Sequence, residues 1–172
     1  MSEGEINVPR LGRIAADPSF RLVAAMNPYD SVGTSRLSMA LYDRTCRISV
    51  GYQDAEQERQ IVRLSAEHAK PALVAEAVTL TRATREHPDL RSGASVRGAI
   101  DYARLVPELA DIRAVPADDW QAGLDAALTT LSGRVRRHES CRRSADQVIE
   151  EIFRSVRAAG PDSAGGDASP GE

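Results

Sequence analysis

Three polar residues stand at positions that suit the handling of a phosphoryl group. Asn27 directly follows an apolar run, Arg44 ends a helix-compatible segment, and Arg97 follows a turn of small residues. An amide at the carboxyl end of a buried strand can orient a water molecule or a phosphate oxygen. An arginine beside a free helix N-terminus attracts phosphate. The pattern fits half of a nucleotide-hydrolysing site.

Each residue also has an ordinary structural interpretation. Asn27 and Pro28 can simply end a strand, because both residue types are common in turns. Arg44 follows Asp43, and such a pair at a helix end can form a surface ion pair or compensate the helix dipole. Arg97 is less ordinary, since a cation in the first turn of a helix is mildly disfavoured by the dipole. Local sequence leaves both interpretations open.

The N-terminal part predicts a few strands around one helix. A short apolar run bounded by turn residues is typical of a sheet interior, and alternation of apolar and polar residues is typical of an edge or half-buried strand. The predicted elements are a hairpin or two short strands at Glu5–Ile14, strands at Phe20–Met26 and Cys46–Tyr52, and a helix at Ser35–Arg44. So few strands do not make an independent sheet. This part therefore resembles the second half of a larger α/β domain.

From Asp54 onward the pattern is helical. Capping residues, Pro71 and the His87-Pro88 pair mark the ends of successive helices. The predicted helices are residues 55–69, 73–87, 92–109, 117–139 and 145–159, the last capped by Ser144. The Gly, Pro, Ser and Asp content of residues 159–172 predicts a disordered tail.

Composition indicates an ordinary globular protein. The chain has 172 residues, of which 42% are apolar and 27% charged, and its net charge is -3. Neither nucleic acid nor a membrane is therefore expected as a partner, and without a signal peptide the expected compartment is the cytoplasm. The basic run Arg134–Arg143 lacks interleaved aromatic residues and is interpreted as a solvated helix end. Cysteine and histidine residues show no metal-ligand spacing, so no metal site is predicted.

A phosphate-binding loop is missing. Such a loop needs Gly-x-x-x-x-Gly-Lys-Ser/Thr, and the only lysine, Lys70, follows Ser-Ala-Glu-His-Ala and precedes Pro71. The sequence also contains no adjacent Asp-Glu pair. Residues that grip phosphates and Mg²⁺ are therefore not apparent.

The three motifs together resemble part of the MoxR-type AAA+ ATPases. Residues 20–52 are similar to the region from the sensor-1 strand through the arginine-finger helix, and residues 3–14 to the hairpin that precedes it. Residues 92–105 resemble the sensor-2 segment, written Gly-Ala-Ser-x-Arg, at the start of a lid helix. The resemblance covers residues 2–109 and keeps the family's motif order.

The resemblance implies a role for each residue. Asn27 would be sensor 1, which positions the attacking water, and Arg97 would be sensor 2, which contacts ATP phosphates. Arg44 would be the arginine finger, which stabilises charge on the phosphoryl group in a neighbouring subunit's site. Arg36 and Arg47 compete with Arg44 for that role. ATP and Mg²⁺ are the implied cofactors.

The sequence departs from the family because the Walker A and Walker B regions are absent. The first residues align with an internal point of family members, so the start is expected to be an internal one. Residues that only position water or contact phosphates cannot act on a nucleotide that the protein does not bind. We therefore expect the chain alone to be inactive.

The expected fold is an α/β fragment, comprising the C-terminal strands of an AAA+ P-loop core and an all-helical lid bundle. The expected domains are residues 1–53 (core), 54–109 (lid), 110–158 (helical extension) and 159–172 (tail). Full-length relatives form rings, expected to be hexameric, and perform chaperone-like maturation of metalloenzymes, often with a von Willebrand factor A-domain partner. The alternative is a non-enzymatic helical module that binds a ring partner.

Overall fold

The computed structural model describes residues 4–25 and 43–160. The chain divides into two compact units, Met1–Ser49 and Val50–Glu172, and each is described by itself. Five α-helices and two small antiparallel sheets occur in the described residues. The expected mixture of strands and helices is confirmed, with helix predominating. The expected domain boundaries stay a prediction.

The N-terminal unit contains the predicted hairpin. Strands β1 (Glu5–Val8) and β2 (Gly12–Ala15) pair antiparallel, with Val8 opposite Gly12. Arg10 and Gly12 adopt positive φ values of 72° and 79° in the connecting turn. Glycine accepts this conformation without steric cost, which explains why the strand returns at Gly12.

The two other predicted strands are not present. Phe20–Ala25 and Cys46–Tyr52 are irregular in the structure, and Val23, Ile48 and Val50 are 92%, 85% and 87% exposed. A strand forms only against a neighbour that accepts its backbone hydrogen bonds. In the described residues β1 and β2 pair only with each other. Apart from Asp43 and Arg44, which lie in a turn, the predicted helix Ser35–Arg44 is outside the described residues.

In its described residues the second unit contains five helices where five were predicted, but the first ends at Ser65 and not at residue 69, and the third begins at Val96 and not at residue 92. They are α2 (Ala55–Ser65), α3 (Pro71–Glu86), α4 (Val96–Arg113), α5 (Trp120–Leu131) and α6 (Ala145–Ala159). The Asp54 carboxylate caps α2 by accepting from the Gln57 amide, and Ser144 caps α6 in a reciprocal capping box with Gln147. These side chains satisfy amides that a helix leaves unpaired at its start, so the starts of these two helices could be predicted locally.

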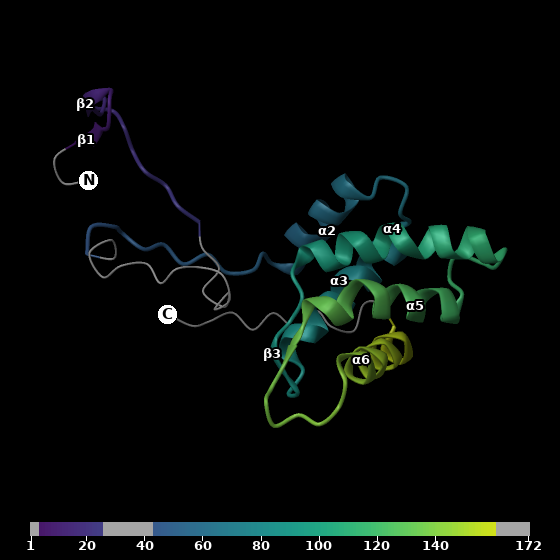
Figure 1. Cartoon of the computed structure of the whole chain (residues 1–172). Helices are drawn as coiled ribbons and strands as arrows, with labels where there is room; N and C mark the ends of the chain where they lie inside the picture. Colours follow the sequence, from purple (N-terminus) through teal and green to yellow (C-terminus); the bar gives the residue numbers. More distant parts are fainter. Residues whose placement is uncertain (1–3, 26–42, 161–172) are drawn as a thin grey trace. The chain divides into compact units, whose positions relative to one another are not determined.

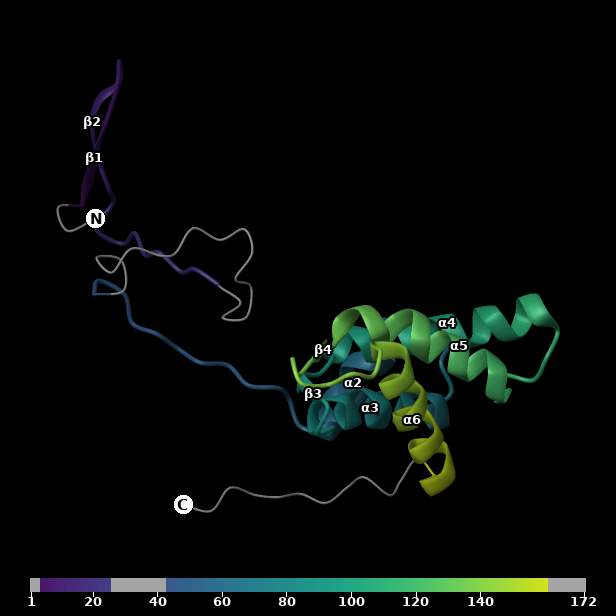
Figure 2. The same cartoon turned by 60° about the horizontal axis from the view of Figure 1, so that its bottom comes forward.

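Four helices enclose the core. Helix α3 packs on α4, α4 on α5, α5 on α6 and α6 on α3, while α2 lies against α3 and α4 (Figures 1 and 2). The largest fully buried apolar side chains include Leu80, Tyr102, Leu131 and Phe153. The core therefore draws on α3 through α6, with α2 adding Val62.

A short second sheet closes one end of this unit. Strand β3 (Leu90–Ser92) pairs antiparallel with β4 (Arg136–Arg137). The helix predicted at 117–139 therefore ends at Leu131, continues as the 3-10 turn η1 (Ser132–Arg134) and then becomes extended. Strands of two or three residues are too short to produce a readable alternation.

Within the described residues, no helix combines the length and apolar character that crossing a membrane requires.

Candidate functional site

Arg97 lies in the first turn of α4 and is exposed. Ser95 is the N-cap residue but makes no side-chain hydrogen bond to the helix, and the first turn contains no acidic residue. Within the described part of the chain no ion pair of Arg97 is found. The position thus combines a cation with helix-start amides, which favours an anion.

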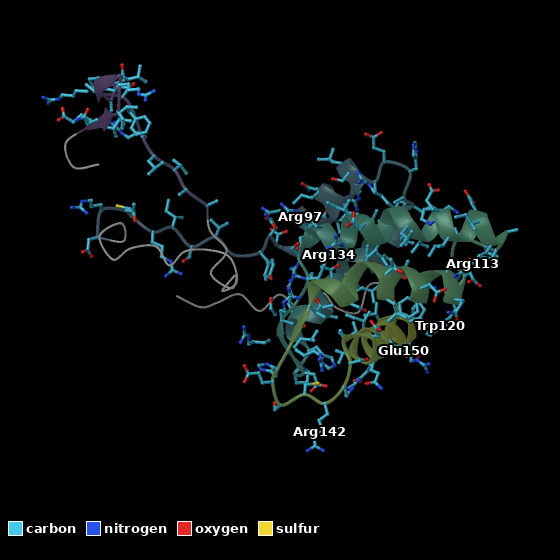
Figure 3. The ribbon with its side chains drawn as sticks, viewed as in Figure 1. Arg97, Arg113, Trp120, Arg134, Arg142 and Glu150 are labelled. Atoms are coloured by element: carbon cyan, nitrogen blue, oxygen red, sulfur yellow. The ribbon has the colours of Figure 1, made fainter. Side chains whose placement is uncertain are left out.

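Arg134 of η1 adds a second cation near this turn. A Cβ placed on Gly98 would lie 3.8 Å from Cδ of Arg134. Its Nη2 lies 2.5 Å from Oδ2 of Asp101, so this guanidinium is already paired. Figure 3 shows Arg97 and Arg134 near the start of α4, away from Arg113 at its other end. Arg97 is therefore the better placed of the two to contact a phosphate.

The other predicted residues are not assembled with Arg97. Asn27 and Arg36 lie outside the described residues. Arg44 is exposed in a turn and Arg47 is exposed in an irregular segment, both in the N-terminal unit. Arg97 belongs to the helical unit, and the two units are described separately. The roles of Asn27 and Arg44 therefore stay predictions.

The turn before α4 is held by the end of α3. The Oγ1 of Thr84 accepts a hydrogen bond from the Ala94 amide at 2.8 Å, and Nε of Arg85 donates to the Ala94 carbonyl at 2.8 Å. A Cβ on Gly93 would lie 2.6 Å from the Arg85 backbone nitrogen. The backbone amide and carbonyl of Ala94 are therefore both hydrogen-bonded to the end of α3, and Ala94 lies three residues before Arg97.

The Arg85 side chain is anchored on a buried carboxylate. Its Nη2 donates to Oε1 of Glu58 at 2.7 Å and its Nη1 donates to Oε2 at 3.3 Å, a two-point contact. Glu58 is 1% exposed, and Arg82 adds a third contact at 3.4 Å. Two cations thus surround one buried carboxylate, which satisfies the rule that buried charges are paired.

The segment that enters the helical unit docks on the same arginines. The Arg85 guanidinium carbon lies 3.8 Å from the centre of the Tyr52 ring, within the range of a cation–π contact. Nη1 of Arg82 donates to the Gln53 carbonyl at 3.3 Å. Tyr52, Glu58 and Ala94 therefore meet on the single side chain of Arg85.

A second polar cluster fastens α6 to the bundle. The Tyr102 hydroxyl donates to Glu76, and Nε of Arg157 donates to the same carboxylate oxygen at 3.0 Å. Burial, with the neighbouring Glu76 carboxylate, strongly raises the pKa of Tyr102. Nη1 of Arg157 also donates to the Asp118 carbonyl at 3.0 Å. This cluster joins α3, α4 and α6 and has a structural role.

Sequence reasoning missed Arg85 and Glu58. One signal was available for Glu58, which precedes the buried Val62 by four residues and so occupies the apolar face of α2. A charged residue on that face indicates a buried pair, because an unpaired charge would be too costly there. Arg85 carried no such signal, since its partners come from three different segments.

Mg²⁺ is one of the cofactors that the resemblance implies. A protein-held Mg²⁺ ion takes oxygen ligands from carboxylates and similar groups. Among residues 4–25 and 43–160 no group of three or more His, Cys, Asp or Glu could hold a metal ion. We therefore derive no step through a metal held by these residues.

In the comparisons with known proteins, no family model and no curated protein matched the chain.

Proposed function

We propose that this chain carries the phosphate-steering and lid elements of a MoxR-type AAA+ ATPase. Arg97 contacts ATP phosphates as sensor 2, Asn27 positions the attacking water as sensor 1, and Arg44 acts as the arginine finger. Residues outside these 172 hold the phosphates and Mg²⁺. The work of the assembled ring is chaperone-like remodelling or maturation of a metalloenzyme client, with a von Willebrand factor A-domain partner.

The observation that carries the proposal is the presentation of Arg97. Its guanidinium is exposed in the first turn of α4, with no carboxylate in that turn. The turn before it is held by Thr84 and Arg85 at the end of α3, which bond the amide and the carbonyl of Ala94. A cation at a helix start whose backbone is held in place adds to the attraction of the helix-start amides for phosphate, and cations that contact the phosphoryl group assist its transfer.

The exposed apolar residues of the N-terminal segments give further support. Val23, Ile48 and Val50 are nearly fully exposed although the segments around them have strand-like composition. Large apolar side chains that stay exposed in strand-like segments are the surface that pairing with further strands would cover. A sheet completed by strands other than β1 and β2 would bury them, as an AAA+ core requires.

The first experiment measures nucleotide binding by the chain alone. We expect no micromolar affinity for a fluorescent ATP analogue and no hydrolysis, because steering residues need a held nucleotide. Micromolar binding would contradict the assignment of the phosphate-holding groups to residues outside this sequence.

The second experiment supplies those groups in trans. A full-length MoxR-type ATPase is mixed with the chain, and ATP turnover is measured. We expect the wild-type chain to raise turnover and the Arg44→Ala and Arg97→Ala variants to lose that stimulation. Arg142→Ala is the matched control, because Arg142 is also an exposed arginine of the helical unit. No stimulation, or equal stimulation by all variants, would contradict the proposal.

A non-enzymatic helical module is the second candidate. It is favoured by the closed core of the helical unit, which draws on all five helices and the end sheet. Such a module would comigrate with the ring in size-exclusion chromatography. Its binding would be unaffected by Arg44→Ala or Arg97→Ala, and it would leave ATP turnover unchanged.

A further inference from the structure

We infer that Arg85 is a positioning residue that couples the entering segment Tyr52–Gln53 to the turn that presents Arg97. The inference rests on the proposed function only where it calls Arg97 a phosphate contact. The coupling itself consists of contacts within the helical unit. It can therefore be measured without nucleotide.

The Arg85 guanidinium is held in one position by Glu58. It makes a two-point contact with Glu58, whose carboxylate is 1% exposed. If Arg85 moved away, it would leave this buried carboxylate with only the longer contact to Arg82. A buried charge that loses its partner is strongly destabilised, so the pair keeps the guanidinium in place.

Arg85, together with Thr84, determines where α4 begins. Its Nε holds the Ala94 carbonyl, and the residue before it, Thr84, holds the Ala94 amide. Gly93 passes so close to the Arg85 backbone that even a methyl group would not fit. Ser95 contributes no side-chain cap, so these contacts replace the local signal that normally sets a helix start.

Tyr52 contacts the same Arg85 guanidinium that holds the Ala94 carbonyl. Tyr52 is 56% exposed, and the centre of its ring lies 3.8 Å from the Arg85 guanidinium carbon. Arg82 holds the neighbouring Gln53 carbonyl while also reaching Glu58. A displacement of Tyr52–Gln53 therefore perturbs both arginines that neutralise Glu58, and through Arg85 it reaches Ala94.

The test is hydrogen exchange of the full chain, followed by mass spectrometry, in Tyr52→Leu and Tyr52→Phe. Leucine removes the cation–π contact and phenylalanine keeps it. In Tyr52→Leu we expect exchange to rise about threefold in peptides covering residues 50–57 and also in those covering 93–99. In Tyr52→Phe we expect both regions to stay at the wild-type rate.

A purely local role for Tyr52 gives a different result. Faster exchange confined to residues 50–57 in Tyr52→Leu, or equal effects of leucine and phenylalanine, would overturn the inference. Arg85→Lys provides a second measurement, because lysine keeps the charge but lacks the planar fork that serves Glu58 and Ala94 together. We expect it to accelerate exchange at 93–99, while Arg154→Lys on α6 leaves that region unchanged.

The two proposals can fail separately. Coupled exchange with no stimulation of a partner ATPase would keep the positioning role of Arg85 and reject the role of Arg97. Stimulation without coupled exchange would do the reverse. If both hold, Tyr52→Leu should weaken the stimulation of turnover and Tyr52→Phe should preserve it.

Discussion

Replacing Glu58 by glutamine tests how the helical unit holds its most buried carboxylate. The substitution keeps the size of the side chain and one carbonyl oxygen, but it removes the charge that faces Arg82 and Arg85. Arg85 is only 11% exposed, so water cannot replace the lost partner, whereas Arg82 at 32% exposure can regain some hydration. Breaking a buried pair typically costs 3–5 kcal/mol, and we expect about 3 kcal/mol here because one arginine is partly solvated.

The assay is urea unfolding followed by circular dichroism. Unfolding free energy falls by roughly 1–3 kcal/mol per molar urea in small proteins, so a loss of about 3 kcal/mol lowers the midpoint by about 1–3 M. Glu150→Gln is the matched control, because Glu150 pairs with Arg154 on the surface, where the two side chains are 38% and 64% exposed. We expect a change within about 1 kcal/mol for this control. Equal losses in the two variants would refute the claim that Glu58 is an essential buried partner.

Two further predictions concern packing and pH. In Gly98→Val even the Cβ atom would lie 2.8 Å from a methyl carbon of a buried leucine of α5. We expect this variant to lose about 1–3 kcal/mol of unfolding free energy, measured by urea unfolding. Gly133→Ala is the control and should change little, because a Cβ there has no neighbour within 4 Å. Tyr102→Phe should lose about 1–2 kcal/mol at pH 8, because Glu76 loses a donor. Burial raises the pKa of Tyr102, so its stabilisation is complete below the ordinary tyrosine pKa of about 10 and declines above it. Wild-type unfolding free energy should therefore fall more steeply than that of Tyr102→Phe as the pH rises above about 10; parallel curves there would contradict this assignment.

Helix starts show how much could be predicted locally. Asp54 and Ser144 cap helices by bonding amides three residues ahead, and Pro71 begins a helix because it needs no amide partner there. The hairpin was predictable for the same reason, since Gly12 permits its own turn conformation. In each case the deciding contacts lie within a few residues.

The strands predicted at Phe20–Met26 and Cys46–Tyr52 show that a local sequence pattern is not sufficient to predict a strand. Their apolar residues have strand propensity, but a strand also requires a neighbour, and the described hairpin does not supply one. Conversely, β3 and β4 form between segments more than forty residues apart because helix packing brings them together. Sheet formation was thus decided by what lies beside a segment.

By itself, the sequence determined the helices and the hairpin, because these elements are specified by caps, turns and periodicity within short windows. It also showed that Arg97 follows a turn of small residues, although it placed the start of the helix at residue 92 and the structure places it at Val96. Only the tertiary structure decided how that turn is held. Arg85 contacts Tyr52, Glu58 and Ala94 together, and no local pattern reveals a side chain whose partners come from three separate segments.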